Sequence, residues 1–297
     1  MRSRMDPALL TIVASMCLIF CDCSAKNEDL RASGLALPLA ESRIIDFALE
    51  SGYMRQKMPC KIYLPRGYGS GAAYPVLYAL NGHSSNETMW VDAGLPESAD
   101  ALIATGGIHP LIMVFPYARD STLEELQREY EKNGRLGERS MDRFLCRELV
   151  PYIDSHYDAA LSADRRFIGG LSMGGAIALR VAFHHSDMFS KVGAYTPAVL
   201  SRDYSDKQLE GWLYPNEELG GVGDIAKFDA DRGFDRLTVY LDAGDSNDPF
   251  AAGVQSLYYA LQRRGIRSEL HLYSGGHSLD HNKRDFGSYL KFYDADH

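Results

Sequence analysis

The stretch "FIGGLSMGGAIAL", from Phe167 to Leu179, decides the fold of this chain. Residues 170–174 read GLSMG, a G-x-S-x-G pentapeptide between a run that predicts a strand and a run that predicts a helix. Glycines on both sides of a serine at such a junction are typical of a strained turn too tight for flanking side chains. The alternative is an ordinary turn that merely contains a serine. In this context the pentapeptide predicts that Ser172 is a nucleophile above the carboxyl edge of a sheet.

Strand and helix patterns alternate on both sides of this pentapeptide. The expected strands are 42–49, 61–65, 74–80, 111–116 and 165–171, followed by "KVGAYT", "RLTVYLDAG" and "SELHLYSG". The first two are expected to pair antiparallel, and the runs 74–80 and 111–116 are continuously apolar, as in strands buried on both faces. This alternation predicts an α/β fold with a mostly parallel central sheet and helices on both faces. Within the helix expected over 140–157, Pro151 should cause a kink.

Composition and charge narrow the class of partner. The chain has 297 residues, of which 45% are hydrophobic and 24% charged, which is ordinary for a globular protein. Its formal net charge is −9, and its lysines and arginines form no long basic run. This balance argues against nucleic acid or anionic lipid as the main partner.

The first 25 residues are expected to be an export signal. Two arginines precede an apolar run, Ala8–Phe20, that is too short to cross a bilayer of roughly 30 Å as a helix. Cleavage after "CSA" (Cys23–Ala25) would release a soluble protein, whereas "LIFC" (Leu18–Cys21) resembles a bacterial lipoprotein box with Cys21 as a lipid anchor. Both readings predict an extracytoplasmic protein, secreted or membrane-anchored. The third reading is an N-terminal anchor that is never cut.

The rest of the chain divides into a linker over 26–41 and one catalytic domain over 42–297, with a small cap insertion at about 199–234. Only Cys60 and Cys146 lie outside the signal region. They could pair in an oxidising compartment, but we expect two buried free thiols, one on a strand and one on a helix.

A serine nucleophile needs a base, and in an α/β-hydrolase the chain order is serine, acid, histidine. His184 and His185 follow Ser172 on its own helix and are expected at the surface. His277 lies in "LYSGGHSLD", a glycine-containing loop after the last strand, where an imidazole can reach over the sheet edge. His277 is therefore the expected base, with His281 in reserve.

The acid is expected after the preceding strand, in "LTVYLDAGDSNDPF". Asp242 lies within the strand, whereas Asp245 and Asp248 both lie in the loop beyond it. Asp248 precedes Pro249 and could instead cap the next helix. Spacing alone leaves the choice between Asp245 and Asp248 open.

An oxyanion hole needs two backbone donors. The Met173 N–H is one expected donor. The second should come from the loop "NGHSSNETMW", where Gly82 would allow a turn and the amide of His83 or Ser84 could point inward.

These pieces together resemble the "putative esterase" family of α/β-hydrolases, which includes S-formylglutathione hydrolases, feruloyl and tributyrin esterases, siderophore esterases and mycolyltransferases. The matching stretches are "IYLPRGYGSGAAYPVLYALNGHSSNETMW", "RFLCRELVPYIDSHY", "FIGGLSMGGAIALRVAFHHSDMFSKVGAYT", "LDAGDSNDPF" and "LYSGGHSLDH", spread over about residues 42–293. The resemblance implies an aromatic residue two positions after the catalytic aspartate, which favours Asp248 because of Phe250. One extra residue after Gly244 keeps Asp245 in reserve.

The resemblance implies a serine carboxylic-ester hydrolase that acts through Ser172, His277 and Asp248 without a cofactor or metal. An acyltransferase with the same acyl-enzyme, or a non-catalytic binding module, are the alternatives. The expected substrate is a small-molecule or carbohydrate-linked ester. Segments 117–139 and 199–234 should rim the site, the first as a solvated helix and the second with Tyr204, Trp212 and Tyr214 lining a substrate pocket. The acidic stretch "FDADRGFD" lacks the spacing of a calcium loop.

Overall fold

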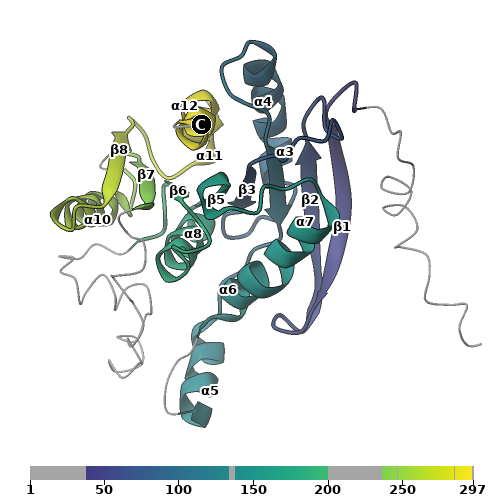
Figure 1. Ribbon diagram of the computed structural model, residues 1–297. Helices are drawn as coiled ribbons and strands as arrows, with labels where there is room; N and C mark the ends of the chain where they lie inside the picture. Colours follow the sequence, from purple (N-terminus) through teal and green to yellow (C-terminus); the bar gives the residue numbers. More distant parts are fainter. Residues whose placement is uncertain (1–37, 134–137, 200–235, 246, 284, 296–297) are drawn as a thin grey trace, which may run out of the picture. The chain divides into compact units, whose positions relative to one another are not determined.

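One sheet organises the part of the chain that the structure describes. The computed structural model describes residues 38–133, 138–199, 236–245, 247–283 and 285–295 (Figure 1). Within these ranges eight strands lie in the order β1-β2-β4-β3-β5-β6-β7-β8. Their bounds are β1 Arg43–Ser51, β2 Gln56–Leu64, β3 Val76–Leu80, β4 Ile112–Pro116, β5 Arg166–Leu171, β6 Lys191–Tyr195, β7 Thr238–Ala243 and β8 Arg267–Leu272.

The sheet is mostly parallel. β1 pairs antiparallel with β2, and β2 pairs antiparallel with β4. From β4 through β3, β5, β6, β7 and β8 every pairing is parallel, which confirms the predicted sheet. Every residue of β3 and β4 is buried, as their continuous apolar runs predicted, and every residue of β6 is buried as well. Because parallel strands end at the same edge, the loops that follow β3, β5, β7 and β8 gather there.

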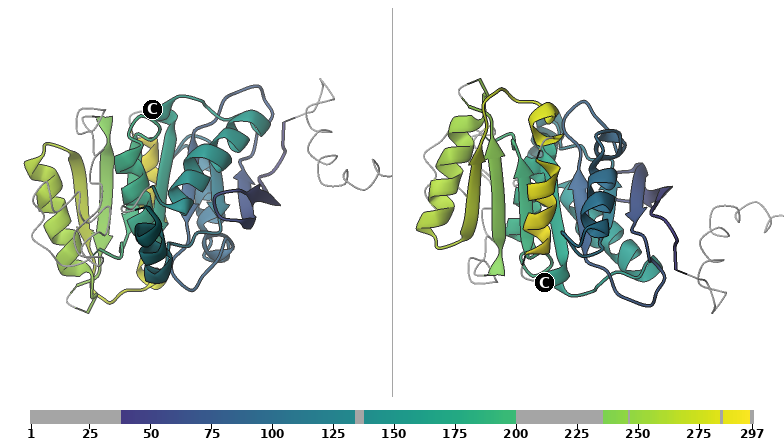
Figure 2. Two further views of the ribbon diagram at one scale, coloured as in Figure 1. Left: turned by 90° about the horizontal axis from the view of Figure 1, so that it is seen from below. Right: turned by 90° about the horizontal axis from the view of Figure 1, so that it is seen from above.

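Helices cover both faces of the sheet, as predicted (Figure 2). On one face α7, α8 and α10 pack on a core of aliphatic side chains, and on the other α3, α4 and α12 pack on a core rich in aromatic rings. The helices are α3 Met89–Asp92, α4 Leu95–Ala104, α5 Leu123–Asn133, α6 Ser140–Phe144, α7 Val150–His156, α8 Met173–His184, α10 Ala251–Arg263, α11 Leu279–Lys283 and α12 Phe286–Asp294.

A π-helical turn, Leu145–Leu149, lies between α6 and α7, directly before Pro151, where a kink was predicted. The Val150 N–H donates to the carbonyl of Leu145, five residues earlier. Pro151 then stands in the first turn of α7, where its missing N–H costs little. The helix therefore widens before the proline instead of breaking at it.

Cys60 on β2 and Cys146 in the π-helical turn are both buried and are free thiols, as expected. Burial raises the pKa of both thiols well above the usual value, so neither is a reactive thiolate.

Several expectations lie outside the described residues. They are the export signal with its possible anchor at Cys21, most of the linker, and the cap insertion apart from Val199. Among the helices of the described ranges, none is long and apolar enough to cross a membrane.

Candidate active site

Ser172 lies at the turn between β5 and α8 in a strained backbone conformation. Its φ is 53° and its ψ −113°, which a residue with a side chain rarely adopts. The flanking glycines are required by close packing. A Cβ on Gly170 would lie 2.5 Å from the Gly174 carbonyl carbon, and one on Gly174 would lie 2.5 Å from the Asn81 backbone oxygen. The G-x-S-x-G sequence therefore forms the tight turn that its glycines predicted.

The backbone of this turn is anchored from a neighbouring strand. The Ser172 N–H donates to the Tyr195 carbonyl at the end of β6, at 2.8 Å. The Ser172 carbonyl accepts from Ala176 N and Ala198 N, each at 3.0 Å. These bonds oppose relaxation of the strained φ and hold the serine at the start of α8.

The loop after β8 brings His277 to Ser172. His277 Nε2 lies 2.8 Å from Ser172 Oγ, an ordinary hydrogen-bond distance. On the other side of the ring, Nδ1 lies 3.4 Å from Asp248 Oδ1, which is longer than a normal N–H···O bond. Nδ1 is buried and makes no hydrogen bond within the described part of the chain, so Asp248 is the carboxylate that it faces.

The Asp248 carboxylate is buried beside the His277 imidazole and is fixed by backbone hydrogen bonds. The side chain is fully buried. Oδ2 accepts from the Gly244 N–H at 3.0 Å, and Oδ1 accepts from the Phe250 N–H at 2.9 Å. The Phe250 ring packs edge-on against the imidazole, with the ring centroids 5.0 Å apart. Backbone donors therefore compensate the buried charge and fix its direction toward His277.

The other two aspartates of this segment point elsewhere. Asp245 is exposed, and its carboxylate accepts hydrogen bonds from Asn247 and Ser274. Asp242 is completely buried at the end of β7, where Oδ1 accepts from the Thr196 N–H at 2.6 Å. Burial raises the pKa of Asp242 well above its usual value although the Thr196 N–H opposes that shift. The structure thus brings Asp248, and not Asp245, to His277.

The loop after β3 packs directly on the serine turn. The Asn81 backbone oxygen and the Gly82 Cα approach Gly174 and Leu171 of that turn. The turn at 82–85 is closed by a bond from Ser85 N to Gly82 O. We expected Gly82 to supply the unusual backbone, but φ is positive at Ser84 (59°) instead.

Asn81 fixes this loop with its side chain. The residue is buried, and its amide nitrogen donates to the carbonyls of Gly82, Ser85 and Ala118. Its Oδ1 accepts from the Ala118 N–H at 2.7 Å. Asn81 thereby ties the loop after β3 to the loop after β4. The sequence-based prediction at Asn81 concerned only the backbone. A polar residue directly after an apolar strand was the feature that could have indicated a role for its side chain.

The backbone amides of Met173 and His83, the two expected oxyanion donors, lie at the start of α8 and in the loop after β3, respectively. Met173 begins α8, so its N–H has no intrahelical acceptor. Neither that amide nor the His83 amide donates a hydrogen bond within the described ranges. The His83 side chain is exposed. The role of the two amides as oxyanion donors stays a prediction.

A buried ion cluster supports the loop after β4 and was missed from the sequence. Arg180, on α8, donates to both oxygens of Asp142 at 2.7 and 2.8 Å. The same guanidinium reaches Asp120 at 2.9 Å. The segment 117–139 therefore carries the expected helix, α5, but its start is anchored in the protein. A lone arginine within the apolar run "IALRVAF" was the available signal.

The expectation of surface positions for His184 and His185 is wrong. Both are partly buried, and His185 Nε2 lies 2.9 Å from a Glu138 carboxylate oxygen. Burial, with the nearby charges of His185 and Arg180, lowers the pKa of His184 to about 3. His281 lies on α11, and nothing is described of its side chain. Tyr204, Trp212 and Tyr214, expected to line a pocket, lie outside the described residues.

Comparisons with known proteins agree with this architecture. The model of the family described as "Putative esterase" matches residues 51–291, and the chain belongs to this family of α/β-hydrolases. An endo-1,4-beta-xylanase/feruloyl esterase of Xylanibacter ruminicola is 27% identical over 253 residues, which cover 82% of this chain and 30% of that protein. The esterase Rv1288 of Mycobacterium tuberculosis is 26% identical over 73% of this chain and 51% of its own length. The chain thus spans about half or less of these relatives.

A solved structure of a ferulic acid esterase superposes with a TM-score of 0.68 at 25% identity. The alignment covers 86% of this chain and 98% of that structure. The shared fold therefore extends over nearly all of the esterase and most of this chain.

Proposed function

We propose that this protein is a serine carboxylic-ester hydrolase with Ser172, His277 and Asp248 as its catalytic triad. The observation that carries the proposal is the 2.8 Å contact between Ser172 Oγ and His277 Nε2 at a strained strand-to-helix turn. Asp248 faces the opposite ring nitrogen, which gives the order nucleophile, base and orienting acid. Family membership supports ester hydrolysis as the chemistry.

Acylation would begin with proton transfer from Ser172 Oγ to His277 Nε2 as Oγ attacks the ester carbonyl carbon. The carbonyl oxygen becomes an oxyanion, which the amides of Met173 and His83 would bind. Asp248 would keep the proton on Nδ1 and stabilise the imidazolium. The tetrahedral intermediate then collapses, the C–O bond to the alcohol breaks, and Nε2–H gives its proton to the leaving alkoxide. The product is an acyl-enzyme on Ser172.

Deacylation would reverse these roles with water. His277 takes a proton from a water molecule while the water oxygen attacks the acyl carbon. A second oxyanion forms and would be bound by the same two amides. Collapse breaks the bond to Ser172 Oγ, which recovers its proton from Nε2. The carboxylic acid leaves. Hydrolysis is proposed over acyl transfer because the relatives compared above are named as esterases.

The proposed substrate is an extracytoplasmic ester of a small molecule or carbohydrate. The apolar run behind two arginines at the N-terminus supports export. Two of the compared proteins carry feruloyl or ferulic acid esterase in their names. Methyl ferulate is therefore the first ester to test, beside acetyl and longer-chain p-nitrophenyl esters.

A fluorophosphonate probe tests the assignment of the nucleophile. Wild-type protein and a Ser155→Ala control, altered at a surface serine on α7, should be labelled and should hydrolyse p-nitrophenyl acetate. Ser172→Ala should lose labelling and at least a thousandfold in kcat. Equal labelling of Ser172→Ala and wild type would refute the proposal.

A further inference from the structure

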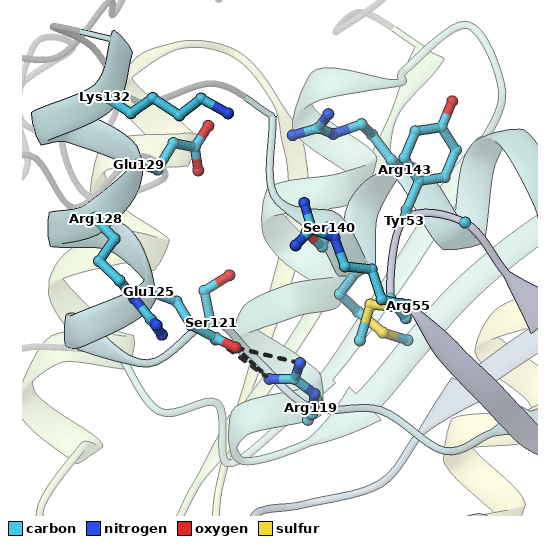
Figure 3. Close-up of a pocket in the computed structure, with 13 residues that line it drawn as sticks. Tyr53, Arg55, Arg119, Ser121, Glu125, Arg128, Glu129, Lys132, Ser140 and Arg143 are labelled. Atoms are coloured by element: carbon cyan, nitrogen blue, oxygen red, sulfur yellow. Dashed lines mark hydrogen bonds and ion pairs between the residues drawn. The ribbon is translucent and has the colours of Figure 1, made fainter.

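A cavity of about 610 Å³ lies between α5 and the turn that joins β1 to β2. Its walls come from the turn at 52–55, the loop after β4, one side of α5 and the residues 140–143 around α6 (Figure 3). None of the proposed triad residues lines it. The cavity is therefore a second concave surface, separate from the residues that perform the chemistry.

The walls of this cavity are strongly cationic. Its lining includes five basic residues and two acidic ones: Arg55, Arg119, Arg128, Lys132 and Arg143, with Glu125 and Glu129. Arg55 and Arg143 extend toward α5 from the body of the domain, and Lys132 extends toward them from α5 (Figure 3). This excess of positive charge stands out in a chain whose net charge is −9.

The protein pairs only some of these cations with carboxylates: Arg119 with Glu125, and Arg128 with Glu124 at 3.9 Å. Glu125 is engaged by Arg119 at 3.2 Å and by the Thr122 N–H at 2.9 Å. Arg55 and Lys132 make no hydrogen bond or ion pair within the described part of the chain. Bringing like charges together around an empty space costs free energy, and an anion placed there would recover it.

An aromatic ring lies among the cations. Tyr53 is 36% exposed at the cavity wall. The Arg143 guanidinium lies 5.5 Å from the centre of its ring, and the Arg143 Nε donates to the Glu138 carbonyl at 2.9 Å. These contacts hold Tyr53 and Arg143 in place beside each other. A fixed aromatic face next to fixed cations suits a ligand that carries both flat apolar surface and negative charge.

We propose that this cavity binds an acidic oligosaccharide, a sugar chain that carries carboxylate groups. A volume of about 610 Å³ lies in the range for drug-sized ligands, so it exceeds what a single inorganic anion needs. Guanidinium groups pair bidentately with carboxylates. The exposed part of the Tyr53 ring supplies apolar surface for a sugar.

The cavity is connected to the site through one loop. Arg119 directly follows Ala118, whose N–H and carbonyl are held by Asn81 in the loop beside Ser172. The proposal assigns the sugar chain to the alcohol portion of the ester. This link to substrate rests on the proposed function, but binding itself does not require catalysis.

Binding should be measured on full-length Ser172→Ala protein, which excludes turnover, by isothermal titration with tetragalacturonic acid. Xylotetraose is the neutral ligand, and sodium sulfate is the simple anion. The test variant adds Arg55→Gln and Lys132→Gln. The control adds Arg263→Gln and Lys291→Gln, which remove the same charge from exposed positions on α10 and α12. Thermal melting of each variant checks that it folds.

We expect saturable binding of tetragalacturonic acid that weakens at least tenfold in the test variant and less than twofold in the control. Absence of binding to the parent protein, or equal affinity in test and control variants, overturns the proposal. If xylotetraose binds as tightly as tetragalacturonic acid, the claim that the ligand must be anionic is overturned. If sulfate binds as tightly as tetragalacturonic acid, the claim that the ligand is a saccharide is overturned. Because tetragalacturonic acid carries no ester, its binding does not depend on turnover, and a failed esterase assignment would leave these binding results unchanged.

Discussion

Replacing Asn81 with alanine should remove the hydrogen bonds that tie the loop after β3, beside Ser172, to the loop after β4. The substitution removes the donor to three carbonyls and leaves the buried Ala118 N–H without its acceptor. One buried polar group without a partner costs about 1–3 kcal/mol. Since several groups are affected but some can relax toward water, we expect the free energy of unfolding to fall by about 2–4 kcal/mol.

The effect on catalysis should be larger than the loss of stability explains. Without Asn81 the turn at 82–85 is no longer tied to Ala118, so the His83 amide would lose its position. Loss of one oxyanion donor lowers kcat by about 10²–10³-fold. The KM should change little because the donor acts mainly on the transition state.

Urea unfolding and p-nitrophenyl acetate kinetics at 25 °C would test both expectations. Ile153→Ala, a truncation of a fully buried residue on α7, should cost a comparable 2–5 kcal/mol and serves as the control. It should retain kcat within about threefold. The reasoning fails if Asn81→Ala keeps wild-type kcat, or if the two variants lose activity to the same extent.

Three further predictions concern the proposed acid, a partly buried histidine and the ion cluster. Asp248→Asn should lower kcat by roughly 10³–10⁴-fold because the imidazole loses its orienting charge, whereas Asp245→Asn should stay within about threefold; the reverse order in steady-state kinetics would exchange their roles. His184 has a folded pKa of about 3, below its unfolded value, so it stabilises the fold above pH 6.5 and loses this contribution as the pH falls. Between pH 7 and pH 5 that loss should reach about 2 kcal/mol, and urea titrations of His184→Gln should show a shallower pH dependence; an unchanged slope would contradict this account. Arg180→Met leaves the buried Asp142 carboxylate without its partner and should cost about 3–5 kcal/mol in urea unfolding, part of which Asp142→Asn should restore.

The sequence predicted the sheet well because its signals are local. Continuous apolar runs such as those of β3 and β4 have few alternatives to a strand buried on both faces. The turn at Ser172 was predictable for a similar reason, since glycine on both sides of one serine matches a narrow set of backbone conformations. His277 followed from its position in a loop after the last strand, and the structure places its imidazole next to Ser172.

The contacts that the sequence did not reveal join residues that lie far apart along the chain. Asn81 and Ala118 are 37 residues apart, and Arg180 and Asp120 are 60 apart. The polar side chains of Asn81, Arg180 and Asp120 look ordinary in the sequence until their partners are known. The positive φ at Ser84 was likewise hidden by the neighbouring Gly82, because glycine is permissive without being required to use that freedom.

The choice between Asp245 and Asp248 shows how such contacts decide a role. Both aspartates lie in one turn, and the Asp248 N–H donates to the Asp245 carbonyl. The loop that carries His277 closes on this turn, where the Asp245 N–H donates to the Gly275 carbonyl at 3.0 Å. A Cβ on Gly244 would lie 2.2 Å from that same carbonyl oxygen, so the approach requires glycine there. The loop with His277 therefore sets the conformation of the turn with Asp248, and spacing along either loop alone could not determine which carboxylate faces the imidazole.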